Sequence, residues 1–336
     1  MQQTPIPQSG SVYAATRDGL HLPVIDVTQP RFAVPDDSDS LRKLLDAARD
    51  EERRNRRIPK FIMRWLLKSA AKRSLLLQPL FGGNAAFLDG MSTYVMKLGA
   101  DNLVPPYGSP MDRRAAASPH LTLLRLRTQQ VARLIADGLA TELAKAATAP
   151  LHLINIAGGP AIDSLNALMI LNRAHGNLLR RQIVVHVLDL DEAGPFFGKN
   201  ALAALMADGA PLAGLGVVFD HRRYNWHEPA SLGALLRELG AAGAIVAASS
   251  EGGLFEYGSD AAIVANLETL RAGNVKLVAG SVTSSDEAQR RNITVSRFKL
   301  IPRGLEGFAP LAARGSFKIA QAETAQLSDQ VLLRPL

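Results

Sequence analysis

The chain has 336 residues, of which 47% are hydrophobic and 21% are charged, an ordinary balance for a folded protein of about two domains. It contains no cysteine, which excludes disulfide bonds, thiolate metal sites and cysteine nucleophiles. The formal net charge is +7, and one segment supplies it, because residues 53–73 hold nine Lys or Arg and no acidic residue.

The first 147 residues predict an irregular arm followed by a mostly helical region. Five prolines interrupt residues 1–37, so we expect an extended or partly mobile arm there. The spacing of apolar residues then predicts four helices. They fall near residues 41–55, 60–78, 86–98 and 119–147.

From Leu151 onward the pattern changes to alternating strands and helices. Apolar runs predict strands over 151–159, 182–191, 216–220, 243–250 and 274–282, with helices between them. Such alternation is typical of a parallel sheet covered on both faces. Strands over 295–301, 316–323 and 329–335, joined by loops such as 302–315, predict an antiparallel end to the sheet.

Polar and glycine-rich segments follow the predicted strands, where an open parallel sheet binds its ligands. Gly158 and Gly159 allow a ligand to approach the backbone, and the start of the next helix favours a negative group. Asp189 and Asp191 can accept hydrogen bonds from ribose hydroxyls, and Asp220 can accept one from a base amino group. The three segments together predict an adenosine site.

The segments INIAGGPAID, DLDEAG and VVFDHRRYNW, in this order, resemble motifs of the class I methyltransferases that use S-adenosylmethionine (SAM). Asn155 stands where that family usually has an acid, and Ala157 and Ala161 stand where it usually has glycine. The resemblance implies an α/β fold with a Rossmann-like, seven-stranded, mostly parallel sheet and an antiparallel C-terminal strand over residues 148–336. Residues 1–147 would then form an N-terminal arm and a helical cap that covers the substrate or supports a dimer.

The same resemblance implies SAM as cofactor and S-adenosylhomocysteine as product. It implies a cofactor site made of Asn155, Ala157, Gly158, Gly159, Pro160, Asp163, Asp189, Leu190, Asp191, Asp220, His221, Ser249 and Ser250.

Residues 249–258 follow the fourth predicted strand, where this family places its substrate and the transferred methyl group. Glu251 and Tyr257 are therefore candidates to orient or deprotonate an acceptor, and Tyr107 could reach the site from the cap. A flexible loop with solvated acids explains residues 249–258 as well. The segment lacks the Asn/Asp-Pro-Pro-Tyr/Phe motif of nucleic-acid amino-methyltransferases, so we expect a small-molecule acceptor and no nucleic acid. The histidines show no metal-ligand spacing.

The expected reaction is in-line displacement at the sulfonium methyl group. One alternative is a SAM-consuming cyclisation that releases methylthioadenosine. Others are an NAD-binding Rossmann domain, although AGGPAID contains no G-x-G, and a non-catalytic protein with a degenerate site.

The basic segment 53–73 has three interpretations. It can be a solvated amphipathic helix, a docking face for an acidic partner such as RNA or a protein, or a membrane-surface helix using Phe61, Trp65 and their neighbours. In the resembled family long cap helices often form a dimer interface, so we also expect a homodimer. There is no uncharged apolar run of about 18 residues and no signal-peptide pattern at the N-terminus, so we expect a cytoplasmic protein without a membrane span.

Overall fold

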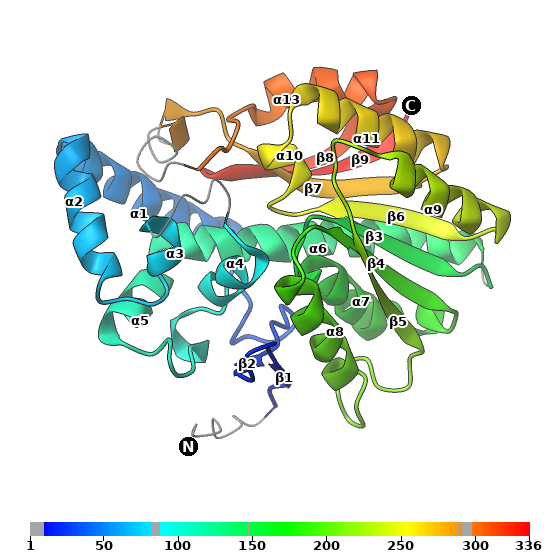
Figure 1. Cartoon of the computed structure of the whole chain (residues 1–336), viewed down its shortest axis with the longest axis horizontal. Helices are drawn as coiled ribbons and strands as arrows, with labels where there is room; N and C mark the ends of the chain where they lie inside the picture. The colour runs from blue at the N-terminus through cyan, green and yellow to red at the C-terminus, as the bar shows by residue number, and fades with distance from the viewer. Residues whose placement is uncertain (1–9, 82–87, 147, 288, 291–297) are drawn as a thin grey trace.

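The computed structural model describes residues 10–81, 88–146, 148–287, 289–290 and 298–336 (Figure 1). Seven strands form its central sheet in the order β5-β4-β3-β6-β7-β9-β8. Strands β3 to β7 run parallel, and β9 lies antiparallel between β7 and β8. The strands are β3 (Leu151–Ile156), β4 (Ile183–Asp189), β5 (Val217–Arg223), β6 (Ile245–Ser250), β7 (Leu277–Thr283), β8 (Phe317–Thr324) and β9 (Ser328–Pro335). The expected seven-stranded sheet with an antiparallel C-terminal strand is confirmed.

Helices cover both faces of the sheet. One face packs against α6 (Pro119–Lys145), α7 (Ile162–His175) and α8 (Ala193–Leu205), the other against α9 (Ala230–Ala241), α11 (Asp260–Ala272) and α13 (Gly304–Arg314). The sequence of β3 is mostly apolar because both faces of the strand are buried. Leu153 points into the first layer and Ile154 into the second, so successive side chains are buried in different cores.

The helical cap is built from α1 (Ser38–Arg56), α2 (Lys60–Ala71), α3 (Gln78–Phe81), α4 (Gly90–Met96), the 3₁₀ turn η1 (Ala100–Asn102) and α5 (Pro110–Ala116). Figure 1 shows these helices at one end of the sheet, with α2 at the outer edge of the molecule. Short polar residues cap α1, α4 and α5: at the start of α1, for example, Asp37 accepts the backbone N–H groups of Asp39 and Ser40. Among the described residues, no helix has the length and apolar character that crossing a membrane requires.

Helix α6 belongs to both the cap and the sheet layers. Its first half packs with α1 through Leu123 and Leu126, whereas a Cβ on Gly138 in its second half would lie 2.8 Å from Leu277 of β7. Arg334 of β9 donates to the carbonyl of Gly138 at 2.9 Å. A division after residue 147, as expected from sequence, therefore separates α6 from the sheet that it covers.

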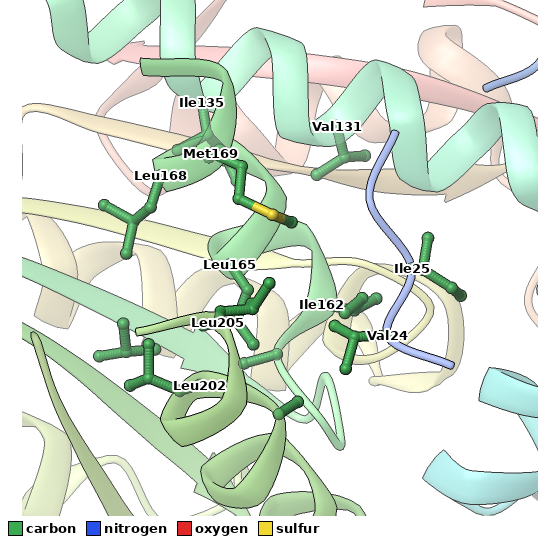
Figure 2. Close-up of a cluster of buried hydrophobic side chains, with 14 of the residues drawn as sticks. Val24, Ile25, Val131, Ile135, Ile162, Leu165, Leu168, Met169, Leu202 and Leu205 are labelled. Carbon is green, nitrogen blue, oxygen red and sulfur yellow. The ribbon is translucent and has the colours of Figure 1, made fainter. Parts of the chain in front are cut away.

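Residues 10–37 of the expected arm are folded against the core. Strands β1 (Tyr13–Ala15) and β2 (His21–Pro23) form a hairpin, and Val24 and Ile25 after it are buried beside Ile162 and Met169 of α7 (Figure 2). Asn166 holds the segment, because its side chain accepts from Val27 N–H and donates to the Ile25 carbonyl. The prolines prevent a helix there, but they do not prevent burial of the apolar residues between them.

The last third of the chain contains a second correction. Residues 302–315, expected as a loop, include α13, and residues 298–301 of the expected strand 295–301 are not in a strand. The rest of that expected strand lies outside the described residues. In α13 the buried residues Phe308, Leu311 and Ala312 have helical spacing, and their packing outweighs the glycines and Pro310.

The close approach of α13 to α11 generates a stability prediction. A Cβ on Gly315, directly after α13, would lie 2.3 Å from the Cβ of Leu267 on α11. We expect Gly315→Ala to lower the free energy of unfolding by about 1–3 kcal/mol through overpacking. Gly307, on the exposed side of α13, is the control, and Gly307→Ala is expected to raise that free energy by about 0.5–1 kcal/mol. Urea denaturation measures both, and equal stabilities would contradict the close packing of the two helices.

Candidate functional site

A cavity of about 500 Å³ lies at the carboxyl ends of β3, β4, β5 and β6, with α4 of the cap over it. This is the position at which open α/β sheets bind ligands, and the volume suits a nucleotide-sized molecule. The cavity collects nine of the residues that the sequence predicted for cofactor or catalysis. They are Ala157, Gly158, Gly159, Pro160, Asp189, Leu190, Asp191, Glu251 and Tyr257.

The turn after β3 has an unusual backbone. Ala157, Gly159 and Ala161 all have φ of 55°, the left-handed region that favours glycine. The two alanines therefore adopt the conformation expected of the glycines that the resembled family has there. Non-glycine residues in this region are strained, and such strain concentrates at functional sites.

Three glycines fix the cap against this turn. A Cβ on Gly159 would lie 2.9 Å from the Cα of Gly90 on α4, and a Cβ on Gly194 of α8 would lie 2.8 Å from the Cα of Gly159. No side chain fits between these backbones. The start of α4 is therefore held directly over the turn that borders the cavity.

Asp189 and Asp191 shape the next part of the cavity. Asp189 ends β4 and accepts from the backbone N–H groups of Gly159 and Asp191, both at 2.9 Å. Asp191 accepts from Ala193 and Gly194 at the start of α8. Each carboxylate oxygen retains capacity for a further hydrogen bond, so both side chains can support the backbone and still accept hydroxyl groups.

Asn155 and Asp163 lie below the turn and not in the cavity lining. Asn155 donates from Nδ2 to Asp163 Oδ1 at 2.7 Å and also contacts Ser164 and Ser249. A Cβ on Gly158 would lie 2.1 Å from Asn155 Oδ1, so this glycine covers the amide. Burial and the nearby Glu251 carboxylate raise the pKa of Asp163 to about 6. The structure thus places both residues as supports of the turn.

The β6 end of the cavity is formed by a buried ion network. Lys97, directly after α4, donates to Glu251 Oε2 at 2.5 Å, and Arg127 of α6 donates to Glu251 Oε1 at 2.5 Å. Arg127 also pairs with Glu256 of α10 (Leu254–Tyr257) at 3.0 Å. Burial by itself raises the pKa of Glu251, but the two cations outweigh it and lower the pKa to about 2. Glu251 is therefore ionised and a weak base.

A second cavity, of about 520 Å³, lies between the cap and the segments that follow β6 and β7. It shares Leu88, Thr93, Gly252 and Tyr257 with the first cavity, so the two meet beside the β6 end of the sheet. Its lining is mostly apolar, and includes Met63, Leu67, Met96, Met111, Leu121 and Leu124. Its polar groups include the side chains of Glu51, Glu52, His120, Arg127 and Glu256.

The two tyrosines predicted for catalysis lie in different places. Tyr257 lines both cavities, and burial together with Glu256 raises the pKa of its hydroxyl. It is therefore a hydrogen-bond donor at neutral pH. Tyr107 is half-buried against the core and lies in the lining of neither cavity.

Asp220 and His221 are not brought to the cavity, because β5 continues to Arg223 and not only to the expected residue 220. Asp220 lies within the strand and accepts from His186 Nδ1 and Arg222 Nε, both at 2.8 Å. His221 lies with Nε2 at 3.2 Å from the carbonyl of Asp189. The residues that enter the cavity from this strand are instead Tyr224 to His227.

Ser249 and Ser250 are buried at the end of β6 and are absent from the cavity lining. Ser250 Oγ donates to the carbonyl of Ile156 and accepts from the N–H of Leu254. Ser249 accepts from Asn155. Both serines therefore connect β6 to its neighbours below the site.

Sequence reasoning missed Trp226, Lys97 and His120. Trp226 was missed because the end of β5 was misplaced. Lys97 reaches the first cavity from the end of α4, and His120 reaches the second from α6. Neither has a local sequence signal, because each is brought to its cavity only by the packing of cap on sheet.

No family model and no curated protein sequence matches this chain. A possible exported protein from Bordetella parapertussis has a similar structure, with 13% identity and a TM-score of 0.51 over 84% of this chain and 98% of that one. The pyocyanin biosynthetic protein PhzM has 14% sequence identity and a TM-score of 0.44, over 95% of this chain and 78% of that one. CalO1, a methyltransferase in calicheamicin biosynthesis, has 15% identity and a TM-score of 0.36 in its S-adenosylhomocysteine-bound form, over 73% of this chain and 68% of that one.

At sequence identities this low, the likeness to these structures shows the fold alone. The strand order, with a single antiparallel strand inserted next to the C-terminal edge, is that of the class I SAM-dependent methyltransferases. The chain therefore has the fold that the resemblance implied.

The pairing of Asp220 generates a pH prediction. Asp220 accepts from His186 Nδ1, so His186 Nε2 must accept from His152 Nδ1, which lies at 2.8 Å. Both rings are then neutral, and burial lowers the pKa of His152 to about 4. As the pH falls from about 6.5 to 4, the unfolded chain binds a proton that the folded chain does not, so folding stability is lost over this interval.

We expect His152→Asn, whose amide can replace the Nδ1 donor, to reduce the loss of folding stability between pH 7 and pH 4.5 by up to about 2 kcal/mol. Urea denaturation at pH 7 and pH 4.5 measures it. His175→Asn, at an exposed position, is the control and should keep the wild-type pH dependence. Parallel pH profiles for wild type and His152→Asn would contradict the neutral pair.

Proposed function

We propose that this protein is a SAM-dependent methyltransferase that acts on a small, mostly apolar acceptor. The observation that supports it best is the pair of cavities. One lies at the ligand-binding edge of a class I methyltransferase sheet, and the other lies under the cap, and they meet at Thr93, Gly252 and Tyr257. A group-transfer enzyme needs adjoining sites for donor and acceptor, and this arrangement supplies them.

The nucleoside half of SAM fits the β4 and β5 end of the first cavity. The carboxylates of Asp189 and Asp191 can accept hydrogen bonds from ribose hydroxyls there. Leu190, with 54% of its surface exposed, and Trp226 provide apolar surface for adenine. The turn from Ala157 to Pro160 lines the same cavity, so its backbone is within reach of the ligand.

The amino-acid half of SAM fits the β6 end. Its carboxylate and ammonium groups are complementary to the Lys97 ammonium and the Glu251 carboxylate, which both line the first cavity. Lys97 has three N–H donors, of which Glu251 takes one, so a ligand carboxylate can be accommodated. These charges are nearly excluded from water. Binding of a charged ligand group beside them is therefore favourable only if that group pairs with an opposite charge.

SAM supplies a methyl group on a sulfonium centre that is already a good leaving group. The protein's residues therefore need mainly to position two molecules and to exclude water. Helix α4 covers the first cavity, and the protonated Tyr257 can donate a hydrogen bond to an acceptor at the junction. For an acceptor that must lose a proton, the candidate base is His120, whose Nδ1 lies 3.5 Å from Glu51 Oε2 in the second cavity.

The alternatives explain less of the structure. If SAM reacted with itself, the second cavity would have no ligand. An NAD-binding protein would use a G-x-G turn, which AGGPAID does not contain. A scaffold protein would not need strained alanines and buried charges at a cavity.

Calorimetric titration tests the cofactor. We expect S-adenosylhomocysteine to bind and NAD not to bind. Trp226→Ala should weaken S-adenosylhomocysteine about tenfold or more by removing a surface for adenine. Asp220→Asn, at a position outside the cavity, is the matched control and should leave the affinity unchanged. Binding of NAD alone, or of neither ligand, would contradict the proposed cofactor.

The role of Lys97 has a separate test. Lys97→Met should weaken S-adenosylhomocysteine by about tenfold or more, because a charge-assisted hydrogen bond is lost. It should hardly change the affinity for methylthioadenosine, which lacks the amino-acid group. The retained methylthioadenosine binding shows that the cavity is intact. Equal weakening of both ligands would show that Lys97 supports the fold and not the amino-acid end.

A further inference from the structure

Helix α2 exposes an apolar face that nothing in the described chain covers. At about 100° per residue, Phe61, Ile62, Trp65 and Leu66 fall on one side of the helix. Their exposed fractions are 75%, 37%, 67% and 42%. Four large apolar side chains in one exposed patch are unusual for a water-facing helix, and such patches commonly mark an interaction surface.

A basic stripe lies beside this face. Lys60, Arg64 and Lys68 of α2, and Lys72 directly after it, follow one another at intervals of four, next to Phe61 and Trp65. The end of α1 with the residue after it, and the residue after Lys72, add Arg53, Arg54, Arg56, Arg57 and Arg73. Arg53 pairs with Asp50 and Arg56 with Glu287. The segment itself contains no acid, so the surface is strongly cationic.

The third side of α2 faces inward. Met63 and Leu67, separated by one helical turn, line the apolar second cavity. One helix therefore separates this cavity from an exposed surface that is both apolar and cationic. Figure 1 shows α2 at the outer edge of the cap, away from the sheet and its helices.

The charge pattern selects among partners for this surface. A second copy of the chain would bring two cationic stripes together, which is unfavourable. A nucleic acid or an acidic protein would neutralise the cations, but a polyanion offers no apolar phase for Ile62 and Leu66. A bilayer with anionic lipids satisfies both features, because its headgroups attract Lys and Arg while its interface buries Trp, Phe and aliphatic side chains.

We propose that α2 docks this protein on the surface of anionic lipid membranes, with Phe61, Ile62, Trp65 and Leu66 inserted at the headgroup boundary. The basic stripe then lies at the level of the lipid phosphates. The helix lies in the plane of the interface and does not cross the bilayer. This docking would place the wall of the second cavity against the membrane, and it does not depend on the proposed methyl transfer.

Vesicle binding tests the proposal directly. The full-length Trp226→Phe variant leaves Trp65 as the single tryptophan, because the chain has two. It is titrated with phosphatidylcholine vesicles and with vesicles that also contain phosphatidylglycerol. We expect a blue shift of Trp65 emission and co-sedimentation with the anionic vesicles, and at least about tenfold weaker binding to the zwitterionic ones or at high salt.

Matched variants of the wild-type chain separate the two contributions by co-sedimentation. Phe61→Ser combined with Trp65→Ser should weaken binding about tenfold or more, whereas Phe196→Ser, at an exposed position on α8, should not. Lys60→Glu combined with Lys68→Glu should weaken binding about a hundredfold, whereas Lys318→Glu on β8 should have at most a small effect.

Three results would overturn the proposal. The first is equal binding to both kinds of vesicle. The second is binding to heparin or polyglutamate with no vesicle binding, which would indicate an acidic macromolecule. The third is a homodimer in sedimentation equilibrium that the Phe61 and Trp65 substitutions dissociate. Titration of the same variants with S-adenosylhomocysteine keeps a failure of the cofactor proposal distinguishable from a failure of docking.

Discussion

The site depends on pairing charges that are almost wholly removed from water. Lys97 and Glu251 line the first cavity, and Arg127 and Glu256 line the second, so the network forms the wall between them. Removing one member of such a network leaves an uncompensated buried charge, which is far more costly than the pair is favourable. The network therefore holds α6, and Lys97 at the end of α4, against the end of β6 and α10. Cap position and cavity shape are set by the same interactions.

The glycine turn adds a steric constraint to this electrostatic one. Gly90, Gly159 and Gly194 bring three backbones together where no side chain fits, and Ala157 and Ala161 hold left-handed conformations beside them. Tight backbone contact fixes one side of the first cavity, and the ion network fixes the other. Because these walls are preformed, the entropic cost of ordering them on ligand binding would be small.

Sequence reasoning was accurate where structure is local. The ends of β3 and β4 were placed within a few residues, so Gly159 and Asp189 were found in the cavity as expected. It failed at β5, an edge strand whose half-exposed polar residues from Asp220 to Arg223 have the composition of a loop. The error placed the expected adenine contact at Asp220, outside the cavity, and left out Trp226, which lines it. The order of residues 10–37 was missed for a related reason, since it comes from Asn166 and the core around α7, not from local propensity.

The sequence by itself determined the parallel sheet and the edge at which the first cavity lies, because strand–helix alternation and glycine-rich strand ends are local patterns. Only the tertiary structure decided which distant side chains meet at that edge. Glu251 lies 154 residues from Lys97 and 124 from Arg127, and neither spacing carries a periodic signal. The second cavity likewise forms only once the cap is packed, and only that packing decides which side of α2 faces the cavity and which side is exposed. Contacts between such distant segments depend on how whole helices fit together, and no short stretch of sequence encodes that fit.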